Sequence, residues 1–320
     1  MTDAALKRYI ALNEALAGAK PKPDTDSLPF TASALLRAVD SEADPDALAE
    51  RTRQMHEALK DRLGQYKAPT GPLRWVYAAM MVAQNLDLER FLQLREALQG
   101  ARKASGTGHL FGGGSRAALI LSLSDEPVET LIARFFAIKQ AIRPPWWRAD
   151  VSVTDTFAAA HAAEGASPTD VAGRREQARA VFKADRVFRS YRHEATRLSV
   201  LLHRSPHQAI AAFEPLREAV KAQKALRHGY DKSMLVSWAV EGLGPDDIRT
   251  MAAISDRLPR KWSSAGSPRT RLAHQILTAG RPGVPGADIS AMAAVIAAQT
   301  AVMVAIMSST MIATTSVTTS

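Results

Sequence analysis

The sequence predicts an all-α protein, an α-solenoid of about seven antiparallel helix pairs related to HEAT and TPR superhelices. The first observation is a repeat: similar amphipathic segments open with a proline, at Pro45, Pro127, Pro168, Pro206 and Pro245. These starts and Pro285 imply a period of 38–41 residues, which is typical of stacked helical repeats. The second observation is composition, since 46% of residues are hydrophobic but only 6% aromatic, and strand-like alternation is hard to find.

Residues 205–221 show the repeat most clearly. Ser205 suits the N-cap of a helix, and Pro206 suits its first position, where a missing N–H costs nothing. Apolar side chains then recur every three or four residues, at Ile210, Phe213, Leu216 and Val220. This spacing places them on one face of a helix, which is predicted to pack on its neighbours.

Three regions follow along the chain. Residues 1–30 form an N-terminal helix to about residue 17 and a proline-rich linker over 19–29. Residues 31–283 form the solenoid, whose first pair is predicted at 31–39 and 45–63. Residues 284–320 form an uncharged Ala/Met/Ser/Thr-rich C-terminal helix and tail. The later first helices of the pairs are expected at about 73–84, 115–123, 153–163, 193–203, 232–241 and 269–279.

The formal net charge is +9, which favours an anionic partner. Between residues 174 and 204, nine Arg and Lys residues face three acidic ones. Because the helices that begin at 168 and 206 are adjacent in the repeat, their cations are predicted to form one basic binding face: Arg174, Arg175, Arg179, Lys183, Arg217 and Lys221. A ladder of helix-end cations is also expected, at Lys60, Arg102, Arg143, Lys183, Lys221 and Arg260, where the helix dipole alone favours positive charge.

Other stretches carry weaker indications. Trp146 and Trp147 could contact a base or a peptide, or fill the seam between two repeats. The glycine-rich residues 104–116 precede a helix but lack the lysine and the strand of a phosphate-binding loop, so a flexible linker is favoured. His203 and His207 straddle a turn without a third ligand, and no metal or cofactor is expected. No nucleophile and base pattern is visible, so catalytic residues are not assigned.

After Asp288 the chain has 32 uncharged residues. Residues 289–307 are apolar enough to span a bilayer, and small residues recur there at Ala293, Ala297, Ala301 and Ala305. Packing on the solenoid or self-association is the favoured interpretation, and a C-terminal membrane anchor is the alternative. The absence of cysteine fits a reducing compartment, so a cytoplasmic location is predicted, with attachment to the cytoplasmic membrane as the alternative.

Three stretches resemble an uncharacterised bacterial family, a domain of unknown function of about this length. They are FRSYRHEATRLSVLL (188–202), YDKSMLVSWAVEGLGPDDI (230–248) and AAVIAAQTAVMVAIMSST (293–310). The resemblance implies an all-α protein with no assigned activity and no functional residues to transfer.

The sequence favours a non-enzymatic interaction or scaffold protein, because solenoids present long concave surfaces and no active-site pattern is visible. Its partner is expected to be an acidic protein or an anionic membrane surface. The alternatives are a nucleic-acid-binding repeat protein with the architecture of helical-repeat glycosylases, an adaptor anchored in the membrane by its C-terminus, and an unidentified enzyme.

Overall fold

The computed structural model describes residues 2–64, 67–105, 109–142, 151–262 and 266–279 of the 320-residue chain. Across these ranges the regular structure consists of α-helices and short 3₁₀ turns, without a β-strand. The all-α prediction is therefore confirmed. No helix of the described ranges is long and apolar enough to cross a bilayer.

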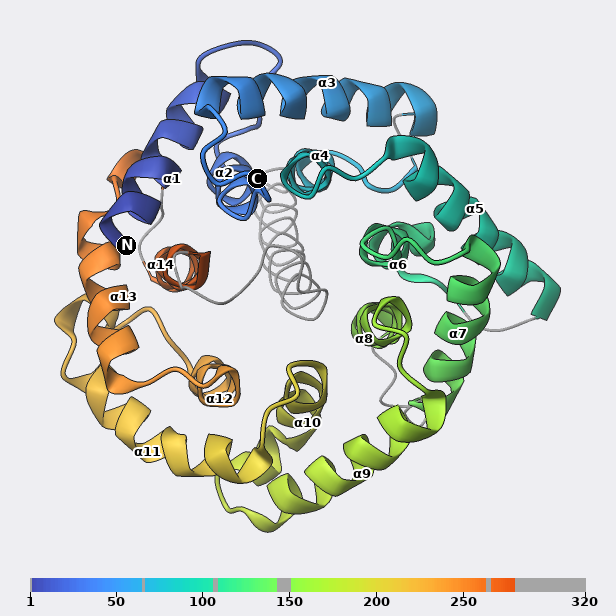
Figure 1. Ribbon diagram of the computed structural model, residues 1–320. Coiled ribbons are helices and arrows are strands. Elements are labelled where there is room, and N and C mark those ends of the chain that lie inside the picture. The colour runs from blue at the N-terminus through green and yellow to red at the C-terminus, as the bar shows by residue number, and fades with distance from the viewer. Residues whose placement is uncertain (1, 65–66, 106–108, 143–150, 263–265, 280–320) are drawn as a thin grey trace, which may run out of the picture.

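The helices form a ring of two concentric layers (Figure 1). The inner layer consists of α2 (Leu28–Leu35), α4 (Pro72–Ala83), α6 (Ser115–Leu121), α8 (Val151–Ala163), α10 (Arg192–Leu201), α12 (Lys232–Glu241) and α14 (Ser267–Ala279). The outer layer consists of α1 (Thr2–Ala17), α3 (Pro45–Leu63), α5 (Leu88–Ser105), α7 (Val128–Ala141), α9 (Pro168–Ala184), α11 (Pro206–Lys221) and α13 (Pro245–Arg257). Each outer helix packs mainly on the inner helix that follows it along the chain, from α1 on α2 to α13 on α14.

The two ends of the described helical array meet, so the ring is closed. Helix α1 contacts α2 and α3 at the start of the array and α13 and α14 at its end. Between the inner helices, Ser33 Oγ donates to Gln275 Oε1 over 2.8 Å, and Arg37 Nη2 donates to Thr278 Oγ1 over 2.7 Å. The helix contacts are consistent with the predicted solenoid, and the array curves until the last inner helix lies beside the first.

Closure gives α1 a role that the repeat pattern does not reveal. Helix α1 packs on α2 and also contacts α14, so it lies across the junction between the two ends of the inner layer (Figure 1). Tyr9, Leu12 and Leu16 of α1 are fully buried. Arg53 of α3 donates to the carbonyl of Ala15 over 2.7 Å. The N-terminal helix is thus a structural member of the ring.

The helix boundaries follow the local signals in most units. The outer helices begin at Pro45, Pro168, Pro206 and Pro245, and the Asp44 carboxylate caps α3 by accepting from the N–H of Ala47. The predicted linker over 19–29 is wrong at its end, because α2 already begins at Leu28. Pro29 lies in the first turn of α2, where a proline removes no helical hydrogen bond.

The core lies between the two layers. The predicted outer-helix core residues Phe135, Phe182, Phe213 and Met251 are all at most 2% exposed, which confirms the repeat register. The ring of Phe188 stacks on Phe182 and meets Phe213 edge-on, so it joins two consecutive outer helices. The inner helices are richer in small residues, which permits close approach of their backbones.

Candidate basic interaction surface

The predicted basic face lies on α9 and α11, but much of its charge is neutralised locally. Arg179 pairs with Glu176 at 3.4 Å, and Lys221 pairs with Glu218 at 3.0 Å. Arg217 pairs with both Glu214 (2.7 Å) and Glu218 (3.3 Å). Acids three or four residues from a cation on a helix share its face, so these partners were visible in the sequence.

The side chains of Arg174 and Arg175 are also engaged by or buried in the protein rather than free to bind a partner. Arg174 Nη1 hydrogen-bonds His203 Nδ1 over 2.8 Å, which directs it towards the turn between α10 and α11. Arg175 is half-buried, and this burial lowers the pKa of its guanidinium. Lys183, in the last turn of α9, is exposed and makes no ion pair with the described chain. The structure thus brings the six predicted residues onto two neighbouring helices but leaves few of their charges free.

A second set of cations is less neutralised. The inner helices are seen end-on in the ring while the outer helices run around it, and the connections from outer to inner helices recur from unit to unit (Figure 1). Several exposed cations in the connections at 183–192, 221–232 and 257–262 have no carboxylate within ion-pair distance in the described chain. We call this set of cations the basic rim. Its members are Lys183, Arg186, Arg189, Lys224, Arg227, Lys232 and Arg260.

The three connections of the basic rim are close together. The Lys232 ammonium lies 5.8 Å from the centre of the Tyr191 ring, which joins the first connection to the second. Gly229 of the second connection approaches the start of α14 so closely that a Cβ there would lie 2.0 Å from Thr270 Oγ1 and 3.1 Å from the Gly266 carbonyl oxygen. The turn at 224–226 also contacts α13, which the third connection follows, so the segments that carry these cations are packed together.

Acidic residues on this rim are engaged in local structure. The Asp185 carboxylate accepts from the N–H groups of Val187 and Phe188, each over 2.8 Å. Asp231 caps α12 by accepting from the N–H of Met234 over 2.8 Å. Glu194 accepts from the Ser233 hydroxyl over 2.7 Å. These carboxylates bind neutral donors and make no ion pair with the cations of the basic rim in the described chain, so those cations remain unpaired there.

The short turns from inner to outer helices and the first turns of the outer helices carry many exposed acids, although the turn between α10 and α11 contributes Arg204 instead. These acids are Asp40, Glu42, Asp44, Asp46, Asp87, Glu89, Asp125, Glu129, Asp170 and Asp246. Helix N-termini favour acids and C-termini favour bases. Most of these acids lie at or near the N-termini of outer helices, and most cations of the basic rim follow their C-termini.

Where the structure describes it, the glycine-rich segment is held in place by hydrogen bonds. Gly112, Gly113 and Gly114 all have left-handed backbones, with φ of 54°, 61° and 86°. Gln99 Nε2 donates to the carbonyl of Gly113 over 2.8 Å, and the N–H of Phe111 donates to Asp155 Oδ2 over 2.8 Å. The flexible-linker interpretation therefore fails for residues 109–114, since these hydrogen bonds fix the loop against α5 and α8.

Asp155 lies at the centre of a buried ionic contact beside this loop. Its Oδ1 is 2.6 Å from Lys139 Nζ, and its side chain is 1% exposed. Burial raises the pKa of the Asp155 carboxyl, while the Lys139 hydrogen bond opposes that shift. The Asp155 carboxylate binds the Lys139 ammonium and the Phe111 N–H. We therefore interpret this ion pair as a structural contact that holds α7 against α8.

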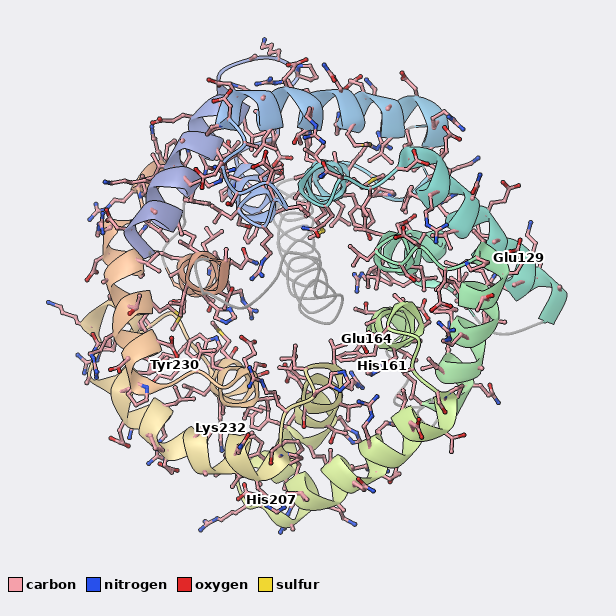
Figure 2. The ribbon with its side chains drawn as sticks, viewed as in Figure 1. Glu129, His161, Glu164, His207, Tyr230 and Lys232 are labelled. Atoms are coloured by element: carbon pink, nitrogen blue, oxygen red, sulfur yellow. The ribbon has the colours of Figure 1, made fainter. Side chains whose placement is uncertain are left out.

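His203 and His207 are not brought together, and the part of the chain that is described contains no cluster of three or more ligand-type residues. Figure 2 shows His161 and Glu164 together on the inner layer and His207 on the outer layer. Glu164 Oε2 lies 3.3 Å from His161 Nδ1 and 3.7 Å from His203 Nε2. His203 thus contacts Glu164 rather than His207.

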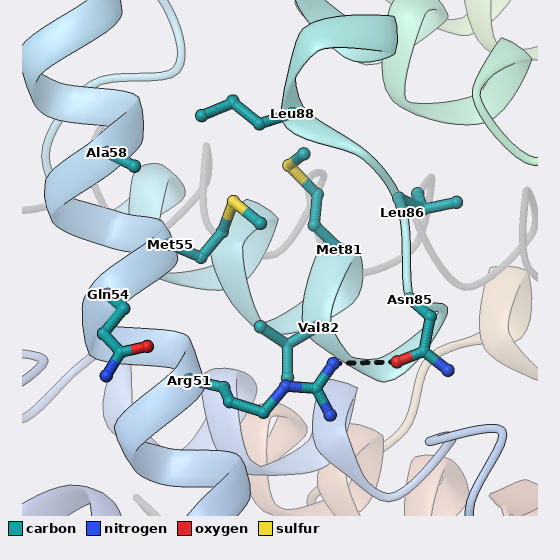
Figure 3. A pocket seen from close by; sticks show the side chains of 9 residues that line it. All are labelled: Arg51, Gln54, Met55, Ala58, Met81, Val82, Asn85, Leu86 and Leu88. Carbon is teal, nitrogen blue, oxygen red and sulfur yellow. Dashed lines mark hydrogen bonds between the residues drawn. The ribbon is translucent and has the colours of Figure 1, made fainter.

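A shallow pocket lies between α3, α4 and the start of α5 (Figure 3). Met55, Met81 and Leu88 form its apolar wall, and Arg51 Nη2 donates to Asn85 Oδ1 over 2.8 Å at its edge. Its lining contains neither a carboxylate nor an imidazole that could act as a general acid or base. Trp146 and Trp147 lie outside the described residues, as do Arg143 and residues 289–307.

No family model matches the chain, and no curated protein and no solved structure matches it.

Proposed function

We propose that this protein is a non-enzymatic interaction protein that binds an acidic protein partner through the basic rim. The observation that carries the proposal is the set of exposed cations on three connections that are packed together, none of which pairs with a carboxylate of the described chain. Exposed charge of one sign on a rigid surface raises the association rate of an oppositely charged partner.

The scarcity of exposed aromatic side chains around the basic rim favours an acidic protein over nucleic acid as the partner. Single-stranded nucleic acids are usually held by exposed aromatic side chains on which bases stack. Among the described residues, the one large hydrophobic side chain that is strongly exposed is Val39, which lies away from the basic rim. Tyr191 is only partly exposed and lies beneath Lys232. The basic rim therefore carries positive charge but, among the described residues, no strongly exposed aromatic side chain on which a base could stack.

The test is binding of fluorescent poly-glutamate and of a 20-base-pair duplex at two salt concentrations. The triple variant Arg186→Glu, Lys224→Glu and Arg227→Glu should weaken poly-glutamate binding at least about tenfold, since three charge pairs are reversed. A matched triple variant on α9 and α11, Arg179→Glu, Arg217→Glu and Lys221→Glu, should have a smaller effect, because those cations are already paired.

Two results contradict the proposal. Equal loss of binding in both triple variants means that overall charge, not the rim, governs association. Tighter binding of duplex than of poly-glutamate, with a steep fall in affinity as salt rises, assigns the rim to nucleic acid instead.

A further inference from the structure

The turn between α4 and α5 leaves apolar surface beside a pocket that the proposed function does not use. After Asn85, whose φ of 50° is left-handed, the Leu86 N–H donates to the Met81 carbonyl over 2.9 Å, a hydrogen bond that ends many helices. The same turn from α12 to α13 has Leu243 in the place of Leu86. Leu243 is 2% exposed, whereas Leu86 is only partly covered. The turn after α4 therefore keeps an apolar surface that its counterpart covers.

This surface belongs to the pocket between α3, α4 and the start of α5, which has a volume of about 350 Å³ (Figure 3). Figure 3 shows the side chains of Met55 and Met81 between α3 and α4, with Leu88 on the side of α5. Met81 is buried, whereas Met55, Leu86 and Leu88 are partly exposed. Methionine side chains are unbranched and adapt to the shape of what they contact. The pocket therefore has an apolar floor that can accommodate a flexible chain.

The edge of this floor is cationic. Arg51 is exposed, and within the described chain its hydrogen bond is the 2.8 Å contact from Nη2 to Asn85 Oδ1. A guanidinium has several N–H donors, so the others remain for a ligand. The turns after α8 and α12 have Gly165 and Gly242 at the position of Asn85, and glycine has no side chain. The asparagine thus adds an acceptor that holds the guanidinium beside the pocket, whose lining contains no carboxylate.

We propose that this pocket binds the carboxylate form of a medium-length fatty acid, of roughly six to ten carbons, because its volume lies at the lower end of the range of small-ligand sites. Such sites are apolar with a few converging polar groups, as this one is. The acyl chain lies on Met55, Leu86 and Leu88, and the Arg51 guanidinium donates to the carboxylate oxygens. The site shares no residue with the basic rim, so its test is independent of the proposed function.

The test is a titration of the full-length protein with octanoate, followed by NMR of ¹³C-labelled methionine methyl groups. The chain has ten methionines, and the signals of Met55 and Met81 are assigned with Met55→Leu and Met81→Leu. These two signals should shift in a saturable manner, whereas that of Met251, in the core beside α13, should not. From hexanoate to octanoate, the affinity should rise by up to about fourfold for each methylene that enters the pocket.

Two controls separate the carboxylate contact from overall charge. Arg51→Ala should weaken octanoate binding about tenfold, because it removes the cation that lines the pocket. Lys60→Ala removes an exposed cation from the same helix outside the pocket and should leave the affinity unchanged. Octanol, which has the same tail without the charge, should bind about tenfold more weakly than octanoate. Octyltrimethylammonium should not shift the Met55 signal, because its head repels the guanidinium.

Several outcomes overturn the proposal. One is the absence of a saturable shift with hexanoate, octanoate and decanoate. Another is equal affinity for octanol and octanoate, or an unchanged affinity in Arg51→Ala, which leaves an apolar contact without a carboxylate site. A common shift of all methionine signals indicates nonspecific association. A Met55 signal that moves with protein concentration in the absence of octanoate assigns the pocket to a second copy of the chain.

Discussion

Closure of the ring by α1 predicts that a substitution in this terminal helix destabilises the whole protein. Leu12 is fully buried, at the centre of α1, where it packs into the core that the helix shares with α2, α3 and α14. Truncation of a fully buried leucine to alanine costs about 2–5 kcal/mol. This is a large part of the ~5–15 kcal/mol that typically separates folded from unfolded proteins. We therefore expect Leu12→Ala to lower the urea midpoint of the entire ring.

The effect is measured with reporters far from α1. Trp75 in α4 and Trp238 in α12 are buried on either side of the closure, and their fluorescence follows global unfolding. Hydrogen exchange should show amides of α9, across the ring, losing protection together with those of α1. The control is Glu14→Ala on the same helix, where an exposed side chain 3.9 Å from Lys261 should change stability by less than about 0.5 kcal/mol.

An open array behaves differently, because each repeat contacts only its neighbours and a terminal helix frays on its own. Loss of protection confined to α1, with unchanged tryptophan fluorescence midpoint and unchanged exchange in α9, would refute closure as a source of global stability.

Three further substitutions test other parts of the structure. Phe213→Ala should cost about 3–5 kcal/mol in urea unfolding, since its ring is buried against Phe188, and a cost below 1 kcal/mol contradicts the assigned core. Gly229→Ala should lower the free energy of unfolding by about 1–3 kcal/mol, because the new Cβ would collide with Thr270 and Gly266. The control Gly173→Ala, which has open space around it, should be neutral or slightly stabilising. A larger loss for Gly173→Ala than for Gly229→Ala disproves the close contact. His56 stacks on the Trp75 ring with 3.9 Å between ring centres, and burial lowers the pKa of its imidazole from 6.5. The unfolded chain therefore binds the proton more readily than the folded protein. Stability should fall as pH drops through and below 6.5. His56→Gln should flatten this part of the pH profile of the urea midpoint, and an unchanged slope assigns the dependence to other groups.

The sequence by itself determined the helices and their repeat. Pro206 after Ser205, with apolar residues at 210, 213, 216 and 220, is sufficient to place an amphipathic helix, because helix capping and periodicity are local properties. The burial of Phe135, Phe182 and Phe213 followed from the same periodicity. The end of the first linker was misplaced because a proline in the first turn of a helix and a proline in a loop look alike when only a few residues are considered.

Tertiary structure alone decided how the repeats are arranged and which charges remain free. Whether a helical array closes depends on small rotations between pairs that add up around the ring, and no single residue encodes them. The contact of α1 with α14 and the hydrogen bond of Ser33 with Gln275 therefore have no local signature. The basic rim likewise contains Arg189, Arg227 and Arg260, which are far apart in the chain and lie on connections that tertiary packing brings into contact.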